Sequence, residues 1–139
     1  MAGATARVEG ATGASRPGRF DIDLSRDLRA TFDPGVIVDL LRVRGRMTQA
    51  SIATATGVSE RTVRSWEIGA EPRRSATDRL HALAEVVASL TETLTPKGAN
   101  QWLQAKASWL DGARPVERLV DDPATVLDRA RTVAEGRHG

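Results

Sequence analysis

The sequence contains no cysteine and only two histidines, His81 and His138. The absence of cysteine excludes disulfide-stapled scaffolds, thiolate metal sites and cysteine nucleophiles. His81 has no second potential ligand at a suitable spacing, and the chain has no histidine pair for a metal, so we expect no metal site. No apolar run approaches the roughly 18 residues that would span a bilayer, and the first ten residues lack the apolar segment of a signal peptide. We therefore expect a cytoplasmic protein with no membrane partner.

The residue patterns of the common enzyme classes are also missing. The sequence holds no glycine-rich phosphate loop, no histidine pair for a catalytic metal, and no serine beside a plausible base. Asp121 and Asp122 are adjacent carboxylates, but Asp122 precedes Pro123 and suits a helix cap better than acid-base chemistry. We assign no catalytic residue and no cofactor, and we expect a protein that is not an enzyme.

Charge is nearly balanced over the whole chain but unevenly distributed along it. The net charge is +2. Residues 42–79 carry 8 basic and 4 acidic side chains, whereas residues 1–41 carry 5 and 6, and residues 80–139 carry 7 and 8. Every basic residue of the middle segment is an arginine, whose planar fork of donors suits phosphate and guanine. Charge alone leaves nucleic-acid binding and an ordinary solvated surface equally open.

The 139 residues can form one ordinary domain or two small ones. Residues 1–19 hold almost nothing to bury, which predicts a disordered tail. Residues 20–32 predict either a short helix or an arm that docks onto the domain. From Asp33 and Pro34 onward, apolar residues recur with helical spacing as far as Gly45. We expect an all-α fold, whose first core helix has the inward positions Val36, Ile37, Leu40 and Leu41.

The stretch TQASIATATGVSERTVRSWEIG, residues 48–69, contains two helical patterns separated by a glycine. Thr48 and Ser59 stand where each helix needs an N-cap. Gly57 permits the positive φ angle that a sharp turn between helices demands. The apolar positions are Ile52, Ala53, Val63 and Trp66. This combination predicts a helix-turn-helix, and the alternative is a helical hairpin that only packs a core.

The outer face of the second helix carries residues suited to DNA. The run from Met47 to Gly69 resembles the helix-turn-helix of Xre-type, phage-repressor-like regulators, with Gln49 at the place of a phosphate-clamping glutamine. Glu60 can accept from cytosine N4, although its more ordinary role is to favour the helix N-terminus. The residues expected to bind DNA are Gln49, Ser59, Glu60, Arg61, Arg64, Ser65, Arg73 and Arg74.

Residues 75–94 predict a long helix, and Ser75 and Asp78 form a capping-box pattern at its start. Its apolar stripe is either core or dimer surface, and comprises Leu80, Leu83, Ala84, Val87, Leu90 and Leu94. Residues 95–139 predict a unit of three short helices, the first of them running through Ala107. About 45 residues make a marginal independent core. This unit should lean on the preceding helix or on a second chain.

The C-terminal unit carries a second resemblance, through Trp102, Leu103, Leu110, Gly112, Pro115, Leu119 and the closing helix up to Gly136. These residues resemble the toxin-binding domain of the Xre/MbcA/ParS antitoxin family. Lys106-Ala107 departs from the family, which often has a Pro-Asn turn there. The order of the two resembling segments also fits that family. The alternative is a generic helical core with a turn.

The two resemblances imply an antitoxin of a type II toxin-antitoxin system. It would neutralise a RES-domain toxin, a NAD-consuming enzyme in that family, and repress its own operon through the helix-turn-helix. Its partners would be that toxin, operator DNA and a second copy of the chain, in a homodimer within a larger complex. The residues expected to bind the toxin are Trp109, Leu110, Arg114, Arg131, Arg137 and His138. The alternative is a stand-alone Xre-family regulator whose C-terminal domain only dimerises.

These expectations divide the chain into four segments. A disordered tail, 1–19, and an arm or short helix, 20–32, precede a helix-turn-helix DNA-binding domain, 33–94, and a toxin-binding helical domain, 95–139. On this view the cytoplasmic protein is associated with the nucleoid when it is bound to DNA.

Overall fold

A computed structural model describes residues 22–136, and every regular element in that range is a helix. The α-helices are α1 (Ile22–Arg29), α2 (Pro34–Val43), α3 (Gln49–Thr56), α4 (Glu60–Glu67), α5 (Arg74–Leu90), α6 (Pro96–Gln104), α7 (Pro115–Arg118) and α8 (Pro123–Ala134), and a 3-10 turn, η1, spans Ser108–Leu110. The expected all-α fold class is confirmed. The tail predicted for 1–19 lies outside the described residues. No described helix is long and apolar enough to cross a membrane.

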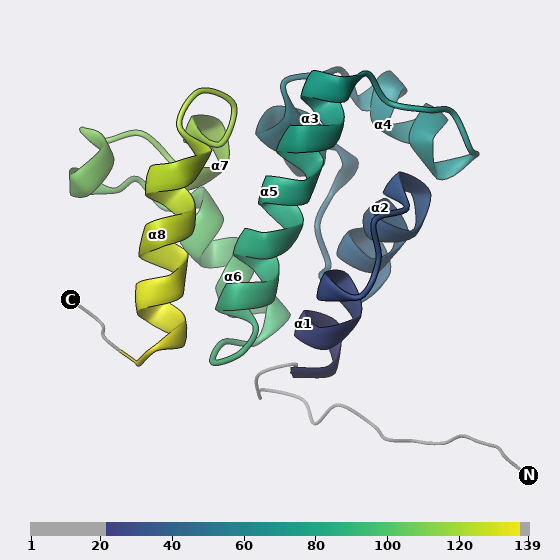
Figure 1. Ribbon diagram of the computed structural model, residues 1–139. Coiled ribbons are helices and arrows are strands. Elements are labelled where there is room, and N and C mark those ends of the chain that lie inside the picture. The colour runs from purple at the N-terminus through teal and green to yellow at the C-terminus, as the bar shows by residue number, and fades with distance from the viewer. Residues whose placement is uncertain (1–21, 137–139) are drawn as a thin grey trace, which may run out of the picture.

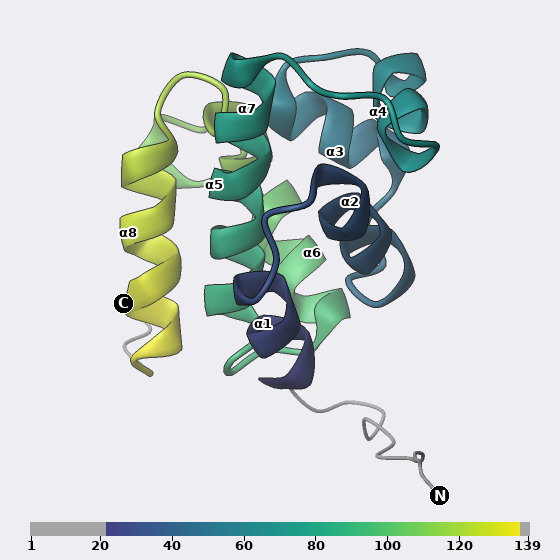
Figure 2. The same cartoon turned by 45° about the vertical axis from the view of Figure 1, so that its right-hand side comes forward.

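The longest helix, α5, runs through the middle of the molecule (Figure 1). Figure 2 shows the same arrangement from another side, with α8 along one flank of α5 and with α1 and α2 on the other. The predicted stripe of α5 is buried from Leu80 to Leu90, and Leu94 lies partly buried just beyond the helix. Val86 is buried as well, because α5 is covered on more than one face. Helix α5 is therefore the common support of the fold.

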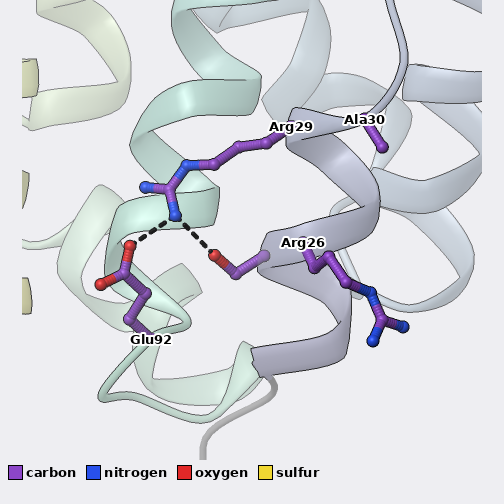
Figure 3. Close-up of a pocket in the computed structure, with 5 residues that line it drawn as sticks. Arg26, Arg29, Ala30 and Glu92 are labelled. Carbon is purple, nitrogen blue, oxygen red and sulfur yellow. Dashed lines mark hydrogen bonds and ion pairs between the residues drawn. The ribbon is translucent and has the colours of Figure 1, made fainter.

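Helix α1 is joined to α5 by one arginine. Arg29 donates from Nη2 to Glu85 at 3.1 Å. From Nη1 it also donates to Glu92, in the turn after α5 (Figure 3). Leu24 and Leu28, on the inner side of α1, are buried. Within the segment 20–32, residues Ile22–Arg29 form a short helix, and this helix packs on α5.

Side-chain caps mark the start of five helices, four of them at predicted positions and the fifth at Thr95. In each case a side-chain oxygen accepts a backbone N–H of the first turn, which would otherwise lack a partner. The capping residues are Asp33, Thr48, Ser59, Thr95 and Asp122. Three of these caps are followed by a proline at the first helical position, where the missing N–H costs nothing.

The predicted inner face of α2 is wrong at one position. Val36 is 46% exposed, whereas Val38 is buried beside Ile37 and Leu41. The face that meets the core is thus rotated toward Val38, because α2 packs between α4 and α5 rather than on a single neighbour.

Two predicted helix ends are also wrong. Helix α5 begins at Arg74, so Ser75 and Asp78 lie inside it and form no capping box. Helix α6 ends at Gln104 rather than at Ala107, because Ala105 adopts an extended backbone with ψ 134°.

One hydrophobic core runs through the described helices. It contains Val63 and Trp66 of α4 together with Val126 and Val133 of α8. The C-terminal segment leans on the preceding helix, one of its two predicted supports, since α8 packs on α5 and α7 packs on α3. The assignment of separate roles to 33–94 and 95–139 stays a prediction.

Candidate functional site

Helices α3 and α4 form a tight pair that turns at Gly57. This glycine has φ +75°, in the left-handed region where a side chain is unfavourable. The N–H groups of Gly57 and Val58 both donate to the carbonyl of Ala53, at 2.8 and 3.1 Å, and so close α3. Val63 and Trp66 are buried beneath the pair. The opposite face of α4 is left open to a ligand.

Unpaired arginines gather on that open face and in the loop that follows it. Four exposed arginines of this region have no hydrogen bond or ion pair within residues 22–136: Arg61, Arg64, Arg73 and Arg74. Six arginines elsewhere in the described chain are paired with carboxylates, namely Arg26, Arg29, Arg42, Arg44, Arg114 and Arg118, whereas Arg46 and Arg131 are exposed and have no ion pair within residues 22–136. An unpaired guanidinium remains available to a phosphate or to the edge of a guanine.

The polar side chains beside these arginines on α4 stabilise the helix itself. Ser59 Oγ accepts the N–H of Thr62 at 3.1 Å, and Ser65 Oγ donates to the carbonyl of Thr62 at 2.6 Å. Glu60 is exposed in the first turn, where its charge favours the helix dipole. Among the α4 residues predicted to bind DNA, Arg61 and Arg64 are thus the two cations without a hydrogen bond or ion pair within the described residues, although the charge of Arg64 also contributes to the lowered pKa of Glu67.

Gln49 is held at the start of α3 by the end of α4. Its Nε2 donates to Glu67 Oε1 at 2.7 Å, while Arg42 Nη1 donates to Glu67 Oε2 at 2.8 Å. Burial opposes ionisation of Glu67, but the hydrogen bonds from Gln49 and Arg42 and the charge of Arg42 hold its pKa below the ordinary value. One carboxylate therefore ties α2, α3 and α4 together. Sequence analysis missed Arg42, since no local pattern links positions so far apart.

Two tryptophans form a half-buried pair on the C-terminal segment. The rings of Trp102 on α6 and Trp109 on η1 lie 5.8 Å apart between centroids, at 36°. Arg129 of α8 lies over Trp109, with its guanidinium carbon 4.9 Å from the ring centroid, a cation–π contact that sequence analysis missed. Leu110 is only 6% exposed, so it supports this surface from below and offers little of its own.

The other predicted toxin-binding residues differ in whether they already have hydrogen-bond or ion-pair partners. Arg114 Nη1 donates to Gln104 at 2.8 Å, and Arg114 Nη2 pairs with Glu117 at 2.8 Å. The side-chain and backbone hydrogen bonds that Arg114 donates to Glu117 lower the pKa of that carboxyl group. Arg131 is exposed and makes no ion pair within the described residues. Two predicted positions lie outside the described part of the chain: Arg137 and His138. Within residues 22–136 no group of three or more histidine or acidic side chains is placed to hold a metal.

Comparison with known proteins relates this chain to toxin-antitoxin systems. No protein-family model matches it. The probable mycobacterial cidal antitoxin Rv3188 of Mycobacterium tuberculosis is 45% identical over 86 residues, which are 62% of this chain and 73% of the relative. A chain of the crystal structure of the M. tuberculosis MbcT–MbcA toxin-antitoxin complex is similar in fold, with a TM-score of 0.64 at 27% identity, over 76% of this chain and 96% of that one.

The substitution Glu67→Gln should lower the free energy of unfolding by about 1 kcal/mol at neutral pH, because it removes the ion pair with Arg42. The pKa of Glu67 is lower in the folded state, so its stabilisation is complete above the unfolded value of about 4.3 and is lost as the pH falls through the folded value. The difference between variant and wild type should therefore shrink below about pH 4.

Urea denaturation at neutral and at acidic pH measures this difference. The control is Glu71→Gln, which removes an exposed carboxylate that has no partner within the described residues. A Glu67→Gln effect that is equally large at both pH values would contradict the assigned role of the carboxylate.

Proposed function

The chain belongs to the family of the probable mycobacterial cidal antitoxin Rv3188, and on that premise we propose that it neutralises a RES-domain, NAD-consuming toxin and represses its own operon. The proposal assigns the two tasks to two surfaces. The toxin is bound by the tryptophan pair of the C-terminal segment, and DNA is bound by the arginine face of α4.

The observation that carries the DNA assignment is the set of unpaired arginines. Arg61 and Arg64 are three positions apart and so share one face of α4. Arg73 and Arg74, at the start of α5, lie at the other end of the loop that follows α4. One recognition helix spans too few base pairs for useful specificity. A dimer would read a two-fold-related site with half-sites one turn, about 34 Å, apart.

The tryptophan pair supports the toxin assignment. Trp109 combines a half-buried indole ring with the guanidinium of Arg129 above it. Tryptophan and arginine are enriched among the residues that carry most of the energy of protein interfaces. The segment's remaining core is already covered by α5, since α8 packs on that helix within one chain. This packing disfavours the alternative in which the C-terminal segment serves only to dimerise.

Co-expression with the RES-domain toxin of the same operon, followed by pull-down and a growth assay, tests the toxin assignment. The full chain should be recovered with the toxin and restore growth. If the chain is recovered without the toxin and growth of the cells is not restored, the proposal is contradicted.

Trp109→Ala should weaken toxin binding by about 2 kcal/mol or more, because truncation of a central aromatic anchor removes its buried contact. Calorimetric titration of the purified pair measures the loss, and thermal unfolding checks that the variant is folded. The matched change Trp102→Ala removes a ring that packs against the main core. It should therefore lower the free energy of unfolding rather than selectively weaken toxin binding. If the folded Trp109→Ala variant keeps wild-type affinity, the toxin is bound elsewhere.

Arg61→Ala or Arg64→Ala should cost about 1 to 3 kcal/mol of operator affinity if the side chain reads a base. If it contacts only phosphate, the loss should be similar on every sequence, and the slope of log K against log salt should fall by about one unit. Fluorescence anisotropy on the upstream promoter separates the two cases. The control is Arg118→Ala, which removes an arginine paired with Asp121 on the C-terminal segment. Unchanged binding by both α4 variants would rule out the DNA assignment.

A further inference from the structure

A basic cleft lies where the helix-turn-helix meets the C-terminal segment. It has a volume of about 430 Å³, and its lining comes from the loop before α3, the start of α3, and α6. The lining residues are Arg46, Thr48, Ser51, Lys97, Asn100 and Gln104. Two of these side chains are cationic and none is acidic, so the cleft is suited to an anion.

Hydrogen bonds from α6 build this cleft. Asn100 Nδ2 donates at 2.8 Å to the backbone carbonyl of Gly45. Gln104 Nε2 donates at 2.9 Å to Ser51 Oγ. Lys97 and Asn100 are three positions apart and Gln104 follows four later, so all three share one face of α6. The two amide bonds hold that face against α3 and its preceding loop, and they bring Lys97 to the cleft that Arg46 also lines.

The two cations of the cleft have no partners of their own. Arg46 and Lys97 are both exposed, and neither makes a hydrogen bond or ion pair with any residue between 22 and 136. Arg46 also has φ +59°, a conformation that costs a residue with a side chain about 1 kcal/mol and that glycine or asparagine adopts more readily. An arginine is present there nonetheless, with its charge uncompensated.

We infer that this cleft binds a phosphate of the DNA backbone beside the site contacted by α4, so that the C-terminal segment itself takes part in DNA binding through Lys97. The inference rests on the DNA binding proposed above. The cleft adjoins that surface directly: Thr48 lines it, and the next residue, Gln49, is tied to the end of α4 through Glu67. The Thr48 hydroxyl donates to Ser51 Oγ, which leaves the Ser51 hydroxyl free to donate. Two cations, this hydroxyl and no carboxylate match the chemistry of a phosphodiester.

The test compares Lys97→Gln and Arg46→Asn with Lys106→Gln, all in the full chain. Asparagine tolerates positive φ, so Arg46→Asn removes the charge without adding backbone strain. Lys106 is exposed just after α6 and does not line the cleft, so its variant loses the same charge elsewhere on the C-terminal segment. Each cleft variant should bind the operator several-fold more weakly, with the salt slope reduced by about one unit and the loss similar on all sequences. Lys106→Gln should match the wild type.

The outcomes separate this inference from the function on which it rests. If Arg64→Ala weakens operator binding while the cleft variants behave like Lys106→Gln, the inference is wrong and the proposed DNA binding stands. If the wild-type chain binds no operator DNA, both fail together. Inorganic phosphate is the probe that tests the alternative, in which the cleft binds a free anion and not DNA. The wild type would then be stabilised by phosphate, the cleft variants would not, and DNA binding would be unchanged, which also overturns the inference.

Discussion

Two surfaces of this protein, the arginine face of α4 and the tryptophan pair of the C-terminal segment, both depend on packing against α5. One side of the helix supports α1, α2 and α3, and another side supports α8. Leu83 and Leu90 are completely buried in this contact, and burial of each such side chain contributes about 2 kcal/mol. A segment as short as 95–136 could not bury enough apolar surface alone. The C-terminal helices are therefore stable because they share one core with helices α1 to α5.

This shared core fixes how the two surfaces lie relative to each other. Helix α7 packs on α3, and a side chain at Gly57 would come within 3.4 Å of Val120. Asn100 and Gln104 add hydrogen bonds from α6 to the loop before α3 and to α3 itself. A toxin held at Trp109 would thus be carried at a set position relative to bound DNA. Helix α6 holds Trp102 as well as Lys97, so one short helix contributes both to the tryptophan pair and to the basic cleft.

Local chemistry was enough to predict much of the fold and part of the candidate site. The caps at Thr48 and Ser59, the left-handed Gly57 and the buried Val63 follow from residue type and spacing within a few positions. The contacts that sequence analysis missed all join distant segments. Arg42 meets Glu67, Arg129 covers Trp109, and Lys97 reaches the cleft of Arg46, and each pairing exists only because helices pack in a particular order. The same limit explains the rotated face of α2, since a helix packed between two neighbours does not follow a single stripe.

Native-state hydrogen exchange tests most directly whether one core supports both surfaces. Amides of α4, α5 and α8 should lose protection in one common opening, with the same free energy and the same dependence on denaturant, because the three helices share buried side chains. The contradicting result would be exchange of α6 and α8 through a separate, lower-energy opening while α2 to α5 remain protected.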